Sequence, residues 1–250
     1  MTNRAEMTRR DILKSGAALA TVTLAEGVTL MAFGGSAAEA AGADAGKRWG
    51  LLIDASKCAT DCNDCVTACK VENGWGSEQE LEHIDPNQAP EWIRKVTLRD
   101  KETGREVSAP VMCQHCESPP CVDVCPTGAS MKRADGIVLV DKHVCIGCRY
   151  CMMACPFKAR SFVHEPLTDQ SVNAPRGQGT VESCTLCVHR VDAGGTPACV
   201  EACAAEGHGA IIFGDLKDPE SEISKRLREF PSVALRPDLD LGAGVRYSNL

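Results

Sequence analysis

Hydrophobic positions after residue 48 fall into short runs, separated by polar stretches that contain glycine and proline. These runs predict strands at Trp49–Asp54, Trp92–Leu98, Ala109–Met112 and Ala210–Phe213. The apolar segments within 129–141 flank an Asp-Gly pair, which predicts a β-hairpin that turns at Asp135-Gly136. A short helix is expected over Glu220–Glu229, with an irregular tail after it. The pattern therefore indicates an α+β fold built from small elements.

The first 40 residues follow a different pattern. A polar start contains Arg9-Arg10 and then Leu13-Lys14, a weakly apolar run covers residues 15–34, and Ala38-Glu39-Ala40 forms a small-x-small cleavage sequence. This order is typical of a twin-arginine signal peptide, so residues 1–40 are expected to direct export of the folded chain to the periplasm. Cleavage and retention as an anchor both remain open. Beyond residue 40 no stretch approaches 18 apolar residues, and we expect no membrane span in the mature chain.

Composition adds a reason to expect bound metal. The chain of 250 residues contains 16 cysteines, while aromatic residues make up only 4%. Few large side chains are available to fill a core, and metal clusters could do so because their binding free energy contributes to folding. The formal net charge of −7 argues against a nucleic-acid partner.

The cysteines form four groups of four, and none is left over. The quartets are Cys58, Cys62, Cys65 and Cys69; Cys113, Cys116, Cys121 and Cys125; Cys145, Cys148, Cys151 and Cys155; and Cys184, Cys187, Cys199 and Cys203. The third quartet has the bacterial ferredoxin spacing C-x2-C-x2-C-x3-C-P for 4Fe–4S clusters. Two alternatives would make the chain an exported structural protein. Disulfides are disfavoured because cysteines two residues apart rarely form good bridges, and zinc ribbons lack the third close cysteine and the trailing proline.

The spacing also predicts which cysteines share a cluster. Three close cysteines wrap one cube, and the fourth is expected to start a helix that carries it to the neighbouring cluster. Four clusters are expected, or three if the first quartet does not hold one. The predicted ligand sets are Cys58, Cys62, Cys65 and Cys203 for cluster 1; Cys69, Cys184, Cys187 and Cys199 for cluster 2; Cys113, Cys116, Cys121 and Cys155 for cluster 3; and Cys125, Cys145, Cys148 and Cys151 for cluster 4.

The arrangement predicts two nested ferredoxin-like modules, each with two 4Fe–4S clusters. The second and third quartets bracket the predicted hairpin, which is the layout of a two-cluster ferredoxin, and the first and fourth quartets flank this unit. The expected division is an outer module of residues 48–70 and 180–214, an insertion at 71–108, an inner module at 109–165, and a C-terminal helix and tail at 215–250.

Several sequence segments resemble a known family. Cys113-Gln114-His115-Cys116, Pro119-Pro120-Cys121 and Cys125-Pro126-Thr127-Gly128-Ala129 resemble the four-cluster electron-transfer subunits of the dimethyl-sulfoxide and polysulfide reductase family. More narrowly, Arg160–His164, Thr180–Val191 and Phe213–Leu216 resemble the DsrO family, the periplasmic iron–sulfur subunits of Dsr membrane complexes. The chain departs from the pattern in two ways: three residues separate Cys58 from Cys62, and no proline follows Cys69 or Cys203.

The resemblance implies a relay without catalysis of its own. Such a subunit passes electrons between an integral-membrane quinone-interacting subunit and a multihaem cytochrome c or another redox subunit of a sulfur-metabolism or respiratory complex. A molybdopterin reductase or a hydrogenase is the alternative setting. The residues agree with this interpretation, because the sequence contains no nucleophile–base constellation, phosphate loop or carboxylate pair.

A few residues near the quartets could modify the clusters. His115, His189 and His208 could replace a cysteine ligand, but each quartet already has four thiols, which favours outer-shell or surface roles. Five cations could tune potentials through their charge, although residues of this kind are more often solvated; they are Lys132, Arg149, Lys158, Arg160 and Arg190.

Overall fold

The computed structural model describes residues 20–25, 28–32, 43–74, 89–166 and 176–250, and the chain divides into two units at residue 40. In the first unit, β1 (Ala20–Ala25) and β2 (Val28–Ala32) form an antiparallel hairpin, where the sequence predicted no folded element. The twin arginines and the cleavage sequence lie outside the described residues. No helix in the described part of the chain is long and apolar enough to cross a membrane.

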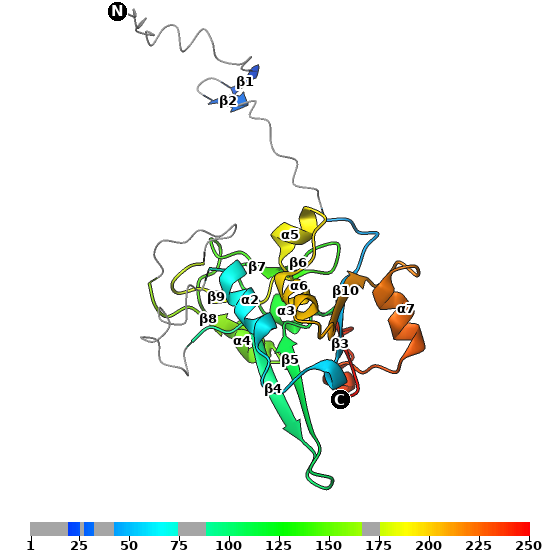
Figure 1. The fold of residues 1–250 in the computed structure, drawn as a ribbon. Coiled ribbons are helices and arrows are strands. Elements are labelled where there is room, and N and C mark those ends of the chain that lie inside the picture. Colours follow the sequence, from blue (N-terminus) through cyan, green and yellow to red (C-terminus); the bar gives the residue numbers. More distant parts are fainter. Residues whose placement is uncertain (1–19, 26–27, 33–42, 75–88, 167–175) are drawn as a thin grey trace, which may run out of the picture. The chain divides into compact units, whose positions relative to one another are not determined.

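A three-stranded sheet with β3 at its centre organises the second unit (Figure 1). Strand β3 (Trp49–Asp54) pairs antiparallel with β10 (Ile211–Asp215) and parallel with β11 (Val245–Ser248). Leu51 and Ile53 are fully buried and Leu52 nearly so, hence both faces of β3 are covered, as its continuous apolar run requires. The strands predicted at 49–54 and 210–213 are confirmed, the second shifted by two residues at its end.

The C-terminal segment is the clearest difference from expectation. The sequence predicted an irregular tail, but β11 joins the central sheet, and Val245 and Tyr247 are fully buried. The prediction was wrong because β11 has only four residues and its partner β3 lies far earlier in the chain. The predicted helix before it is confirmed as α7 (Glu222–Glu229), which starts where the Ser221 side chain accepts a hydrogen bond from the Ser224 amide. A 3-10 turn, η3 (Pro237–Leu239), lies between α7 and β11.

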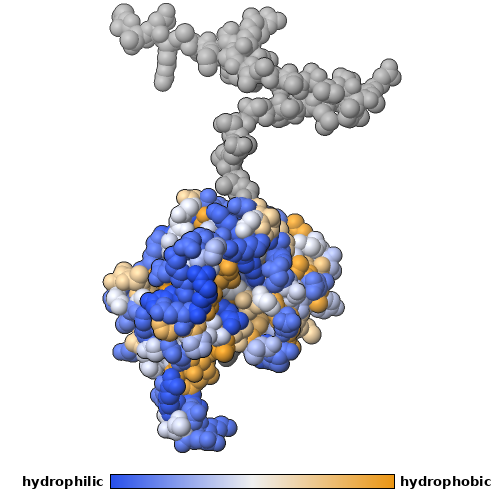
Figure 2. Space-filling view, turned by 90° about the vertical axis from the view of Figure 1, so that its right-hand side faces the viewer, coloured by the Kyte–Doolittle hydropathy of each residue, from blue (hydrophilic) through white to orange (hydrophobic). Residues whose placement is uncertain are grey.

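Three hairpin-like pairs surround the sheet. The strands are β4 (Ile93–Arg99) with β5 (Glu106–Met112), β6 (Ser130–Lys132) with β7 (Val138–Val140), and β8 (Ser161–Phe162) with β9 (Val181–Glu182). The hairpin predicted at Asp135-Gly136 is confirmed, and so are the strands at 92–98 and 109–112. The tip of the β4–β5 hairpin extends away from the sheet and is hydrophilic (Figures 1 and 2).

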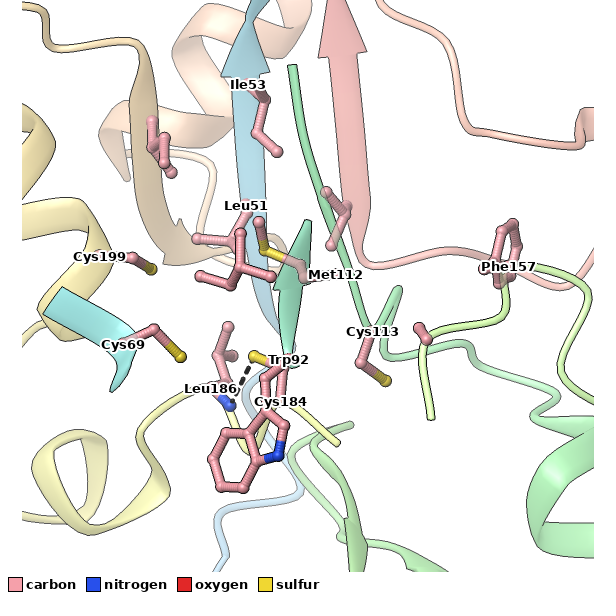
Figure 3. Packing of buried hydrophobic residues seen from close by; sticks show 14 of the residues in the cluster. Leu51, Ile53, Cys69, Trp92, Met112, Cys113, Phe157, Cys184, Leu186 and Cys199 are labelled. Carbon is pink, nitrogen blue, oxygen red and sulfur yellow. Dashed lines mark hydrogen bonds between the residues drawn. The ribbon is translucent and has the colours of Figure 1, made fainter. Parts of the chain in front are cut away.

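The remaining helices are short and carry or adjoin the cysteine quartets. They are η1 (Ala55–Lys57), α2 (Asp64–Glu72), α3 (Pro120–Asp123), α4 (Tyr150–Ala154), α5 (Val188–Asp192) and α6 (Ala198–Ala205). Thiols and aliphatic side chains share one core: Met112 and Trp92 lie between the side chain of Cys113 and those of Cys69 and Cys184 (Figure 3). The observed elements give an α+β iron–sulfur fold whose centre is lined by sulfur.

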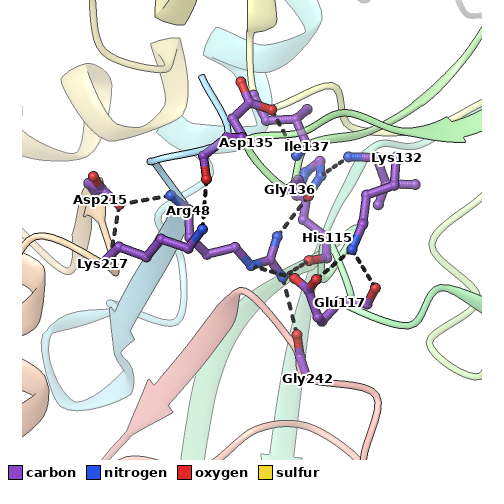
Figure 4. A network of polar contacts seen from close by, with 12 residues as sticks. Arg48, His115, Glu117, Lys132, Asp135, Gly136, Ile137, Asp215, Lys217 and Gly242 are labelled. Carbon is purple, nitrogen blue, oxygen red and sulfur yellow. Dashed lines mark hydrogen bonds and ion pairs between the residues drawn. The ribbon is translucent and has the colours of Figure 1, made fainter. Parts of the chain in front are cut away.

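Arg48 fastens the start of β3 to two distant loops (Figure 4). Its guanidinium donates to the carbonyl oxygens of His115 at 2.6 Å and Gly136 at 2.8 Å, and it pairs with the Glu117 carboxylate at 3.2 Å. Gly136 has φ +86°, and a Cβ there would lie 1.8 Å from Arg48 Nη1. Glycine is therefore required both for the turn and for the approach of Arg48.

Candidate metal centres

Four cavities are each lined by four cysteines. Cavity 1 is lined by Cys58, Cys62, Cys65 and Cys203; cavity 2 by Cys69, Cys184, Cys187 and Cys199; cavity 3 by Cys113, Cys116, Cys121 and Cys155; and cavity 4 by Cys125, Cys145, Cys148 and Cys151. Their empty volumes are similar, at about 310, 300, 310 and 290 Å³. All 16 cysteines are free thiols, which speaks against a disulfide framework. These groupings are the ones expected from the spacing.

The helices deliver the fourth cysteine of each quartet differently from what we predicted. It was expected to start a helix, but α4 contains Cys151 and ends at Cys155, whose φ of −72° and ψ of 112° are extended. Pro156 explains this end, since a residue before proline is disfavoured in the α region. Cys125 likewise follows the end of α3 and precedes Pro126. No proline follows Cys69 or Cys203, and there α2 and α6 continue past the cysteine.

Burial makes the thiols poor acids as long as no cation compensates them. It raises the pKa of Cys65 and Cys113 to about 12 and that of Cys116 to about 11, and repulsion from neighbouring thiolates adds to each shift. The pKa values of Cys184 and Cys199 are raised still further for the same reasons. Metal ligation requires thiolates, so these cavities need a cationic occupant to hold four of them together.

Backbone amides already point at the sulfur atoms. Amide groups donate to Cys203 Sγ from Ala210 at 3.2 Å, to Cys184 Sγ from Leu186 at 3.4 Å, and to Cys125 Sγ from Ser130 at 3.4 Å. Hydrogen bonds to the charged form of a group favour that form. At Cys125, burial opposes ionisation, but the bonds from Ser130 and Thr127 leave its pKa lowered. The loops around the cavities are thus arranged to stabilise thiolates.

Cavity 1 accommodates the unusual first quartet through Lys95. The Nζ of this β4 residue donates to the carbonyl oxygens of Ala59 at 2.5 Å and Cys62 at 2.6 Å, which holds the loop with the extra residue. His208 also lines this cavity. Ligand atoms of Cys62, Asp64 and His208 lie within 4.8 Å of one another, so cavity 1 has the most varied donor set. Lys95 lies 33 positions beyond Cys62, and nothing in the sequence pointed to its role.

The other two histidines have roles outside the cavities. His115 is buried, and its Nδ1 accepts a hydrogen bond from the Val138 amide at 3.0 Å. Burial, with repulsion from Arg48 and Arg160, lowers the pKa of His115 to about 3, and the ring is therefore neutral at ordinary pH. His189 Nε2 lies 2.6 Å from Glu72 Oε1. Neither side chain lines a cavity, which agrees with outer-shell or surface roles.

The donor set fits 4Fe–4S clusters. Each cavity presents four thiols, the ligand number of a ferredoxin cube. Arg160 supplies a second observation: it is buried and donates to Cys121 Sγ at 3.1 Å, and no carboxylate among the described residues pairs with it. A buried cation needs an anionic neighbour, and a cube with four thiolates carries about two negative charges.

Comparisons with known proteins agree with this geometry. A family model described as "4Fe-4S dicluster domain" matches residues 106–215. The chain is 44% identical to the "Hdr-like menaquinol oxidoreductase iron-sulfur subunit 1" of Archaeoglobus fulgidus, over 82% of this chain and 84% of the relative. It is 40% identical to a "Putative dimethyl sulfoxide reductase iron-sulfur subunit" of Halobacterium salinarum, over 80% and 79%. Identity to a tetrathionate reductase subunit of Salmonella typhimurium is 37%, over 81% and 73%.

These relatives cover nearly all of the chain after the first 40 residues, and their names describe subunits of oxidoreductases. The matched domain supplies the cofactor type, and the sixteen thiols supply its ligands. The chain belongs to the family of 4Fe–4S electron-transfer subunits of oxidoreductase complexes.

Proposed function

We propose that this chain relays electrons along four 4Fe–4S clusters, between an integral-membrane quinone-interacting subunit and another redox subunit. The observation that carries the proposal is the set of four similar cavities, each lined by four cysteines from two different quartets. When bound, each cluster accepts and releases one electron. The chain's own contribution is to hold the clusters close together, and to shield and charge their surroundings.

The cysteines of each cavity are the proposed ligands of the cluster with the same number. Cavities 3 and 4 belong to the inner module, and cavities 1 and 2 to the outer one. The exchange of a fourth cysteine between Cys155 and Cys125, and between Cys203 and Cys69, supports two nested ferredoxin-like modules.

Electrostatic contacts between thiols support a linear order of the four sites. Cys65 of cavity 1 acts on Cys69 of cavity 2. Cys113 of cavity 3 acts on Cys184 of cavity 2, and Cys151 of cavity 4 acts on Cys121 of cavity 3. Successive cavities are therefore neighbours, and electrons would pass in the order 1, 2, 3, 4 or its reverse.

The two terminal sites are the proposed points of electron exchange. Every cysteine of cavities 2 and 3 is buried, whereas Cys148 of cavity 4 is exposed and Cys58 and Cys62 of cavity 1 are half-buried. Cavity 4 also has apolar side chains in solvent: Ile146 is 67% exposed and Met153 74%. Exposed apolar groups beside a redox site suit the docking of a partner subunit.

The favoured setting is a quinone-linked membrane complex of the Dsr type, with a multihaem cytochrome c as a further partner. The name of the Archaeoglobus fulgidus relative, a menaquinol oxidoreductase subunit, supports it. The membrane would be reached through partner subunits. Purification of the native complex with identification of its subunits tests this setting. A membrane subunit with bound quinone supports it, and a complex without such a subunit would contradict it.

The second candidate setting is a terminal reductase. It is favoured by the relatives whose names are those of tetrathionate and dimethyl sulfoxide reductase subunits. The same purification separates the two settings, because a molybdopterin subunit would replace the multihaem cytochrome.

We also propose a periplasmic location, reached by twin-arginine export. Arg9-Arg10 supports this proposal. Replacement of both by lysine should leave a cluster-loaded precursor in the cytoplasm, with Arg4→Lys as the matched control. Normal periplasmic delivery of the double variant would refute this route.

A further inference from the structure

Arg160 is a buried cation whose partners are sulfur and a hydroxyl group. Its side chain belongs to a residue only 5% exposed, and Nη1 donates to Ser130 Oγ at 2.5 Å while Nη2 donates to Cys121 Sγ at 3.1 Å. The chain offers a direct contrast in Arg176, which is equally buried but forms a two-pronged ion pair with Glu182 at 2.7 and 2.9 Å. The charge of Arg160 is therefore balanced at the cysteines.

The guanidinium lies at the boundary of two cavities. It lines cavity 3, where it acts on Cys113 and Cys121, and it also interacts with Cys151 of cavity 4. Its partner Ser130 extends the link, since the Ser130 amide donates to Cys125 Sγ of cavity 4 at 3.4 Å. One fixed positive charge thus faces the proposed ligands of two successive clusters.

The consequence follows from Coulomb's law in a weakly screened interior. Reduction adds one negative charge to a cluster site that already carries about two. A buried cation beside that site stabilises the reduced form more than the oxidised form. Since Arg160 faces two sites, it should favour reduction at both, and its charge is permanent at ordinary pH.

We propose that Arg160 raises the reduction potentials of the clusters in cavities 3 and 4 together, and so sets the energy of that half of the relay. The inference rests on the proposed function, in particular on clusters bound in these two cavities. Each reduction adds one electron, supplied by a redox partner or by dithionite in a titration, and Arg160 neither gives nor takes a proton.

The test is an anaerobic redox titration of the cluster-loaded full chain, followed by electron paramagnetic resonance. Arg160→Gln should lower two of the four midpoint potentials and leave the other two unchanged. A tenfold weaker reduction equilibrium corresponds to about 59 mV for one electron, and we expect at least this shift. Arg160→Lys keeps the charge but loses the planar fork, so its two shifts should have the same sign and be smaller.

Lys158→Gln is the matched control, because it removes an exposed cation from the same loop and should move no potential. Four unchanged potentials in Arg160→Gln, or equal shifts in Arg160→Gln and Arg160→Lys, would overturn the inference. If Arg160→Gln does not load iron, Arg160→Lys decides alone: two lowered potentials at full iron content support the role, and unchanged potentials refute it. Wild-type protein without four reversible potentials would instead show that the proposed relay itself is wrong.

Discussion

Cys203, in α6, lines the same cavity as Cys58, which directly follows η1. If both bind cluster 1, Cys203→Ser and Cys58→Ser should change the same paramagnetic signal and reduce the iron content alike. Cys184→Ser should change a different signal, because Cys184 lines cavity 2. Ala204→Ser, at the exposed neighbour of Cys203, is the control and should change neither. Matching signals for Cys203→Ser and Cys184→Ser would refute the crossed assignment.

Gly136 should be essential for the contact with Arg48. Gly136→Ala combines an unfavourable positive φ with a clash against the Arg48 guanidinium, so a loss of stability of about 2–4 kcal/mol is expected. Gly104, with φ +71° and open space around it, provides the control. Gly104→Ala should cost only about 1–2 kcal/mol. Anaerobic thermal unfolding measures both, and equal losses would show that the Arg48 contact contributes nothing.

Tyr247 ties the C-terminal strand to the strand before the second quartet. Its hydroxyl donates to the Pro110 carbonyl at 3.2 Å and accepts from Gln114 Nε2 at 3.2 Å. Tyr247→Phe should cost about 1 kcal/mol of stability through these lost bonds, and Tyr247→Ala about 3–5 kcal/mol through the cavity as well. Tyr150→Phe, at a residue 58% exposed, should be neutral. A neutral Tyr247→Ala would contradict the placement of β11 in the core.

His115 should make the folded state sensitive to acid. Burial holds the pKa of His115 at about 3 instead of 6.5, while the unfolded imidazole binds a proton below its usual value. Its contribution to stability is complete above about pH 6.5 and is lost as the pH falls, by about 1.4 kcal/mol per pH unit. In His115→Asn, the amide oxygen can accept from Val138, and asparagine tolerates the φ of 42°.

The comparison is the slope of unfolding free energy against pH between about 6.5 and about 5, under anaerobic conditions. His115→Asn should flatten this slope, whereas His143→Asn, at an exposed position, should leave it as in the wild type. Parallel slopes for the wild type and His115→Asn would mean that the buried histidine does not contribute to the acid sensitivity.

The sequence predicted elements whose signals are local. Strand β3 has a continuous apolar run, the β6–β7 hairpin has its Asp-Gly turn, and Cys-Pro pairs mark the quartets. It missed β11, whose four residues become a strand only because β3 offers an open edge. It also placed the fourth cysteines at the start of helices, although the proline after Cys155 ends the helix there.

The outer parts of the candidate site were not visible in the sequence. Arg160 resembles a surface cation in one dimension, and its burial depends on Ser130 and Cys121, which are 30 and 39 positions away. Lys95 supports the first quartet from another hairpin. Such contacts join residues that no spacing rule connects, whereas the cysteine quartets obey a spacing imposed by the cube itself.

The central claim is that all four cavities hold 4Fe–4S clusters. Analysis of iron and acid-labile sulfide in anaerobically prepared protein tests it most directly. Four cubes on the 16 cysteines predict about 16 iron and about 16 sulfide per chain. A reproducible value near about 12 would contradict a cluster in one cavity, and cavity 1, with its unusual quartet, would be the first to examine. Zinc without sulfide would contradict the whole account.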